Sequence, residues 1–173
     1  MSPIRKYFYL TSAALSGTSL VTMTTLILAQ IVARFMNTVI PSSEDFAGWL
    51  LSATIFFGLA YTFQEGGHIR VTMLVTRLSD AKRRYLEFFN LVCGLLISGY
   101  LAYYTIFTVY DSFDYEEVTD TYLVVPLWMV QSPMAIGSLF LFIAMLDSLR
   151  IMLMGETPQY VLNEDELSMS GAE

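Results

Sequence analysis

Few side chains in this sequence have the chemistry that a catalytic or metal site requires. His68 is the only histidine and Cys93 the only cysteine of the chain. One cysteine excludes a disulfide within the chain, and one histidine excludes a haem held by two histidines. Glu65 lies close to His68, but a single carboxylate and a single imidazole do not form a metal site. Because no phosphate-binding or nucleophilic motif is present either, we expect no catalytic residue, no cofactor and no metal, and a protein that is not an enzyme.

Two stripes of polar or aromatic side chains recur at helical spacing. A hydroxyl stripe can line a polar path or pack against another helix, and a tyrosine stripe can bind a quinone ring or pack in the same way. No ionisable residue accompanies the hydroxyls, so we favour packing for that stripe. For the tyrosines we favour packing against another helix or a place in the aromatic belt at the membrane interface. The first stripe is Thr11, Thr18, Thr22 and Thr25, and the second is Tyr100, Tyr103, Tyr104 and Phe107.

A third candidate is the acidic segment 111–120, which carries five carboxylates and no basic residue. It lacks the ligand spacing and the central glycine of a calcium-binding loop. We therefore interpret it as a solvated surface or as a docking surface for a soluble partner, in which Glu116, Glu117 and Asp120 make the contacts.

The elements that position these groups follow from the distribution of charge. Only 14% of the residues are charged, and four stretches contain no charge at all: 7–33, 46–64, 88–110 and 121–146. About 20 apolar helical residues cross a bilayer. The sequence therefore predicts an all-α integral membrane protein with four transmembrane helices, at about 9–35, 46–63, 85–110 and 126–150. This pattern excludes a soluble enzyme with one core and a transmembrane β-barrel, whose strands alternate.

We expect one four-helix membrane domain over residues 1–155 and an acidic, disordered cytoplasmic tail over 156–173. The first apolar stretch is too long for a cleaved signal peptide, so we interpret it as a span. Nucleic-acid binding requires a basic face, and the formal net charge is −7. Nucleic acid is therefore excluded as a partner.

Basic residues predict the orientation in the membrane. Arg5 and Lys6 precede the first span, five more lie within 70–84, and Arg150 ends the fourth span, whereas only Arg34 lies on the opposite side. Basic residues concentrate in cytoplasmic segments. Both termini are therefore expected in the cytoplasm.

The segment between the second and third spans is the most distinctive part of the chain. Gly66 and Gly67 bend the chain where it leaves the membrane. The apolar positions after them have helical spacing, which predicts a short amphipathic cytoplasmic segment. The basic group Lys82, Arg83 and Arg84 then leads into the third span, where it can contact the headgroups of membrane lipids.

The interiors of the spans lack the carboxylates, histidines and arginines that solute and ion sites in membranes use. Asp147 and Arg150 lie three residues apart where the fourth span ends, so they can pair with each other. The residues alone thus predict a small membrane subunit that acts by packing against something larger.

The stretch Gly66, Gly67, His68, Ile69, Arg70 and Val71 after the second span resembles the DctQ-type small membrane subunit of the tripartite ATP-independent periplasmic (TRAP) transporters. Residues 125–128, read Val-Pro-Leu-Trp, resemble the segment before the fourth span of that family. Thr72 departs from the family, which commonly has aspartate there. The resemblance covers about residues 5–155.

This resemblance implies two partners: a large DctM-type membrane subunit that moves as an elevator, and a periplasmic substrate-binding protein. It implies sodium-driven uptake of an organic acid or a related small solute across the inner membrane of a bacterium or archaeon. The small subunit would be a scaffold. Its threonine or tyrosine stripe would pack on the large subunit, residues 66–71 would shape the cytoplasmic bend, and the acidic segment would face the binding protein.

Two other classes stay open. One is an accessory membrane anchor of a redox complex, in which the tyrosine stripe is the edge of a quinone site. The other is a self-assembling four-helix channel or organiser, which needs no partner.

Overall fold

The computed structural model of the chain describes residues 3–65, 80–155 and 160–161. This part is helical, with helices α1 (Pro3–Phe35), α2 (Ser43–Gln64), α4 (Asp80–Asp114) and α5 (Leu127–Leu153). All four are long and apolar enough to cross a membrane. Within the described residues no strand forms, and the one isolated bridge joins Val118 and Pro126. For the described residues, the prediction of an all-α protein with four helices long and apolar enough to span a membrane is confirmed.

The helices extend beyond the charge-free stretches of the sequence. α1 already begins at Pro3, and α4 continues to Asp114, so two carboxylates of the acidic segment belong to the helix rather than to a loop. A helix can continue past the membrane boundary because its main chain is paired internally, whatever surrounds its side chains. The first and last charged residues therefore do not mark where a helix begins or ends.

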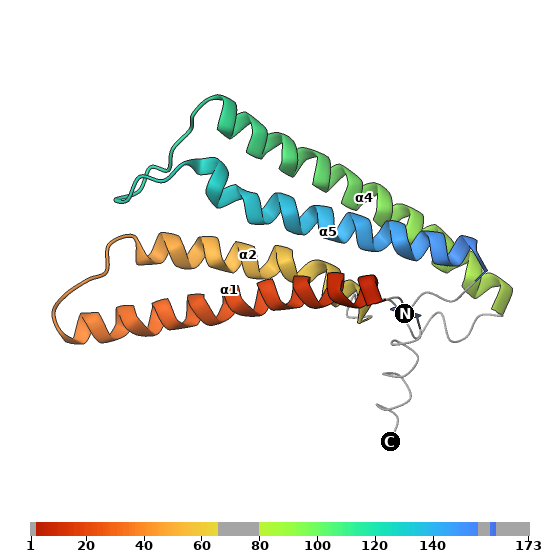
Figure 1. Ribbon diagram of the computed structural model, residues 1–173, viewed down its shortest axis with the longest axis horizontal. Helices are drawn as coiled ribbons and strands as arrows, with labels where there is room; N and C mark the ends of the chain where they lie inside the picture. The colour runs from red at the N-terminus through yellow and green to blue at the C-terminus, as the bar shows by residue number, and fades with distance from the viewer. Residues whose placement is uncertain (1–2, 66–79, 156–159, 162–173) are drawn as a thin grey trace, which may run out of the picture.

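The four helices lie side by side in one layer, in the order α1, α2, α5, α4 (Figure 1). Two antiparallel hairpins, α1 with α2 and α4 with α5, meet along α2 and α5. The start of α1 and the end of α5 lie at one end of the layer, which we call the terminal end. The connections 36–42 and 115–126 lie at the opposite end, which we call the loop end (Figure 1). α5 is the most buried span, whereas α1 is an edge helix with little buried surface.

The contact between α2 and α5 depends on Gly137. A Cβ atom at this position would lie only 2.4 Å from the main-chain carbon and oxygen of Phe56. The buried alanines Ala53, Ala60 and Ala144 lie on the same two helices. Small residues let two helices approach closely and gain dispersion contacts, which in a membrane replace the hydrophobic effect as the cause of association.

Hydroxyl groups and glycines hold the outer helices to the inner ones. Ser12 and Ser16 of α1 donate hydrogen bonds to the main-chain oxygens of Phe57 and Thr54 on α2, the second at 2.7 Å. Serines rather than the threonines of the predicted stripe therefore form the hydrogen-bonded contact between α1 and α2.

The contact between α4 and α5 has the same character. The hydroxyls of Thr105 and Ser138 are paired at 2.7 Å in the buried contact between α4 and α5. Gly94 of α4 leaves room for the side chain of Met145 on α5.

At the terminal end, a buried cluster joins all four helices to two residues that follow α5. Tyr9, Phe63, Leu91 and Met152 belong to it, one from each helix. Tyr160 and its neighbour in the chain are almost fully buried in the same cluster, and the rings of Phe63 and Tyr160 lie 5.1 Å apart. Part of the segment that we expected to be a tail therefore packs on the bundle.

Candidate interaction surfaces

The threonine stripe of α1 faces outward. All four of its members are exposed. Each hydroxyl donates to the main-chain oxygen four residues earlier in the same helix, at 2.7 to 2.8 Å. The hydroxyls are therefore satisfied within α1, and the stripe presents mainly methyl groups. Such a surface is compatible with lipid as well as with a protein partner.

The tyrosine stripe of α4 is also exposed, but its polar groups are not satisfied in the same way. Tyr100 and Tyr103 are 66% and 65% exposed, and Tyr104 and Phe107 about half. The rings contact one another, with centroids 4.4 Å apart for Tyr100 and Tyr104. Within the described part of the chain, none of the three phenol groups forms a hydrogen bond.

The connection between α4 and α5, residues 115–126, is held in shape by hydrogen bonds within the loop. Its two sides meet at Thr119, whose main-chain nitrogen donates to the Val125 oxygen at 2.9 Å. The main-chain nitrogen of Leu123 donates to the hydroxyl of Ser42, so the loop is also tied to the connection between α1 and α2. The loop end of the layer is thus one continuous surface.

The three predicted docking carboxylates differ in their surroundings. Glu117 accepts a hydrogen bond from the Ser112 hydroxyl at 2.8 Å, and its main-chain oxygen accepts one from Leu127, so it has a structural role at the loop. Glu116 and Asp120 are exposed and form no ion pair among the described residues. Tyr122, which sequence reasoning did not single out, is 82% exposed on the same loop.

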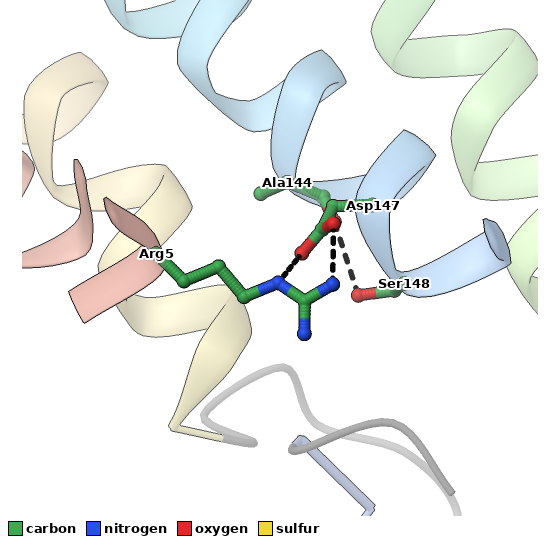
Figure 2. Close-up of polar contacts among 4 residues, drawn as sticks. All are labelled: Arg5, Ala144, Asp147 and Ser148. Carbon is green, nitrogen blue, oxygen red and sulfur yellow. Dashed lines mark hydrogen bonds and ion pairs between the residues drawn. The ribbon is translucent and has the colours of Figure 1, made fainter. Parts of the chain in front are cut away.

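At the terminal end, Asp147 of α5 binds Arg5 of α1. The expected partner, Arg150, does not pair with it. Figure 2 shows the Arg5 side chain reaching across to the carboxylate, with Nε–Oδ2 and Nη2–Oδ1 distances of 2.5 and 2.7 Å. This two-point geometry is the strongest that an arginine and a carboxylate can adopt. The pair joins residues 142 positions apart. Local spacing favoured Arg150. At the terminal end, however, the start of α1 meets α5 directly, as the 5.1 Å separation of the Phe8 and Phe140 rings also shows.

Two groups of predicted residues lie outside the description. The motif Gly66–Val71 falls in the undescribed segment 66–79, and the side chains of Lys82, Arg83 and Arg84 are not described, although α4 includes these positions. Within the described residues, no cluster of histidine, cysteine or acidic side chains is arranged to hold a metal ion.

The sequence matches one protein family over residues 23–153, a region that extends from within α1 to the end of α5. That family is described as tripartite ATP-independent periplasmic transporters, DctQ component. The chain belongs to the DctQ family. The predicted membership of the DctQ family is thereby confirmed, although no curated protein sequence matches this chain.

A DctQ component is the small subunit of a TRAP transporter, and the family is one of transporter components rather than of enzymes. Together with the four apolar helices, membership makes this chain a multi-pass membrane protein. The DctQ family is part of a three-part system that also contains a DctM component and a binding protein. The surfaces described above are therefore those of a DctQ component.

Proposed function

We propose that this protein is the stationary scaffold of a sodium-driven TRAP transporter in the inner membrane. It pairs with a large DctM-type elevator subunit and helps a periplasmic binding protein to deliver an organic acid or related small solute. Membership of the DctQ family is the observation that carries this proposal. Neither a redox anchor nor a self-assembling channel accounts for that membership.

The architecture supports a bracing role. Apart from residues 160–161 at the terminal end, no described segment covers either face of the layer of four helices, and α1 and α4 form its two edges (Figure 1). The spans are apolar, and few of their side chains are buried within the chain itself. Such a layer can lie along a larger membrane protein with one face and meet lipid with the other.

We assign the tyrosine stripe of α4 to the contact with the large subunit. A phenol that faces hydrocarbon loses its hydrogen bonds to water, which costs about 1–3 kcal/mol per group in proteins. A protein partner can offer carbonyl or hydroxyl groups to Tyr100, Tyr103 and Tyr104. The threonine stripe of α1 has no such need, because its hydroxyls are already bonded within the helix.

We place both termini in the cytoplasm, because eight of the nine basic residues belong to the terminal side. The loop end then faces the periplasm, where Glu116, Asp120 and Tyr122 are available to the binding protein. On the cytoplasmic side, residues 66–71 shape the bend after α2, and Lys82, Arg83 and Arg84 contact lipid headgroups.

Affinity purification of the full chain from its native membrane in a mild detergent, followed by intact-complex mass measurement, tests the scaffold role. We expect one large multi-span partner in equal amount. A homo-oligomer without such a partner, also in lipid nanodiscs, would refute the proposal.

Docking at the loop end has its own test. Reversing the charges with E116K and D120K is expected to weaken transport at low concentrations of loaded binding protein, with less effect at saturation, because charges at the rim of an interface mainly change the association rate. The matched control is E65K, which reverses an exposed carboxylate at the terminal end, where α2 ends. Unchanged dependence on binding-protein concentration in E116K/D120K would contradict the assignment.

A further inference from the structure

A groove runs between α1 and α5 at the terminal end of the layer. Its volume is about 500 Å³, and its wall is mainly apolar, with Phe8 contributed by α1 and Ile143 and Leu146 by α5. Arg5 and Arg150 also line it. The groove therefore combines an apolar wall with guanidinium groups at the end of two transmembrane helices, where hydrocarbon gives way to water.

The charges of the groove do not cancel. Asp147 neutralises Arg5 by binding two of its nitrogens, and Figure 2 shows the third nitrogen pointing away from the carboxylate. Arg150 is exposed and, in the described part of the chain, has no ion pair or hydrogen bond from its side chain. Two arginines and one aspartate leave one positive charge without a partner beside an apolar wall.

We propose that this groove binds one anionic phospholipid. The phosphate lies beside Arg150 and the free edge of Arg5, and one acyl chain lies along Phe8, Ile143 and Leu146. A free phosphate ion would not use the apolar wall, and a zwitterionic lipid would not use the unpaired cation as well, so charge complementarity selects an anionic amphiphile. The proposal needs no assumption about transport. With the orientation proposed above, the groove lies at the cytoplasmic leaflet of the membrane, and only this placement depends on that orientation.

Native mass spectrometry of the purified full chain, alone and with its large subunit, tests the site with added phosphatidylglycerol and phosphatidylcholine. We expect one phosphatidylglycerol to be retained per chain, about fivefold more tightly than phosphatidylcholine, which is the effect of one cation at an anionic lipid surface. R150Q should abolish this preference. R34Q is the matched control, because it removes the same charge from the other end of α1, and it should keep the preference.

I143W, which fills the groove without changing charge, should lower the retention of both lipids. Replacing Leu146 by the photoreactive residue p-benzoylphenylalanine, followed by crosslinking, identifies what occupies the groove in the complex. Attachment to lipid supports the proposal, whereas attachment to the large subunit overturns it.

Three further results would also overturn the proposal: equal effects of R150Q and R34Q, equal retention of the two lipids, or displacement of the lipid by millimolar inorganic phosphate. Because the chain alone can be measured, a failure to find the large subunit leaves the lipid result interpretable.

Discussion

In the middle of the layer, Gly137 of α5 packs directly against the main chain of Phe56 on α2. At the edges of the layer, α1 and α4 instead carry exposed threonines and tyrosines. The central contact is already complete within the chain, since Gly137 fits against Phe56 and the surrounding alanines are buried. The exposed threonines and tyrosines of α1 and α4 are not buried by any described residue. The difference indicates that the contact between α2 and α5 holds the subunit itself together, whereas the exposed side chains of α1 and α4 are available to lipid or to a partner.

The largest effect on stability is expected from adding one carbon atom at Gly137, in the contact between α2 and α5. G137A places a Cβ against the main chain of Phe56, so the helices must move apart, and we expect a loss of about 3 kcal/mol in unfolding free energy. The fluorescence of Trp49 and Trp128 during unfolding in detergent measures it.

G17A is the control for that change, because a Cβ at Gly17 on the outer side of α1 meets no atom within 4 Å. We expect it to be neutral or slightly stabilising. If both variants unfold alike, close approach of α2 and α5 is not what holds the layer together.

The aromatic edge should show the opposite behaviour. Y100A/Y104A is expected to leave the stability of the subunit alone almost unchanged, because both rings are exposed. Its binding free energy for the large subunit should weaken by about 2 kcal/mol, the loss typical of an aromatic hot spot. T18V/T22V on the α1 edge is the control. The measurement is the fraction of partner retained during dilution, and equal retention by the two variants would remove α4 from the contact.

The sequence allowed the four spans to be predicted but not their lateral order. Charge-free length decides whether a helix enters lipid, and that is a property of composition. Lateral order depends on which surfaces fit, and apolar helices differ little in pattern from one face to another. The Arg5–Asp147 pair depends on the direct contact between the start of α1 and α5 at the terminal end, and it could not be foreseen from local spacing, which pointed to Arg150.

The candidate surfaces were predicted in part. Both stripes were found because helical spacing places their members on one side. Spacing alone does not show where a hydroxyl donates, so it cannot distinguish Ser12, which bonds to α2, from Thr22, which bonds within α1. Gly137 was not singled out, because a clash with Phe56 is visible only once two helices are placed together.

The two ion pairs of α1 allow the same comparison with charges. The side chains of Arg5 and Asp147 are 34% and 26% exposed, whereas those of Arg34 and Glu44 are 63% and 84% exposed. Exposed pairs contribute about 0–1 kcal/mol, and breaking a fully buried pair costs about 3–5 kcal/mol. For D147N we expect an intermediate loss of about 1.5 kcal/mol. E44Q should cost less than 0.5 kcal/mol, roughly the scatter of surface substitutions.

Thermal unfolding of both variants at low and high salt measures these losses. The difference between D147N and the unchanged protein should persist at high salt, since a partly buried pair is screened less. A loss in E44Q as large as that in D147N would show that burial at the terminal end does not strengthen its pair.

The smallest expected effect separates two hydroxyls on the same helix. S12A removes a buried hydrogen bond to the Phe57 oxygen on α2, and hydrogen bonds between membrane helices contribute about 0.6 kcal/mol on average. T22V removes an exposed hydroxyl that bonds only to Thr18 within α1, so it should be neutral within error. The Ser16 hydroxyl also donates to α2, at the Thr54 oxygen. Combining S12A with S16A therefore makes the expected loss of unfolding free energy larger than the error of the measurement. If S12A/S16A proves as stable as T18V/T22V, the α1–α2 contact is held by shape alone, and the division of the hydroxyl stripe into an inner serine side and an outer threonine side has no energetic meaning.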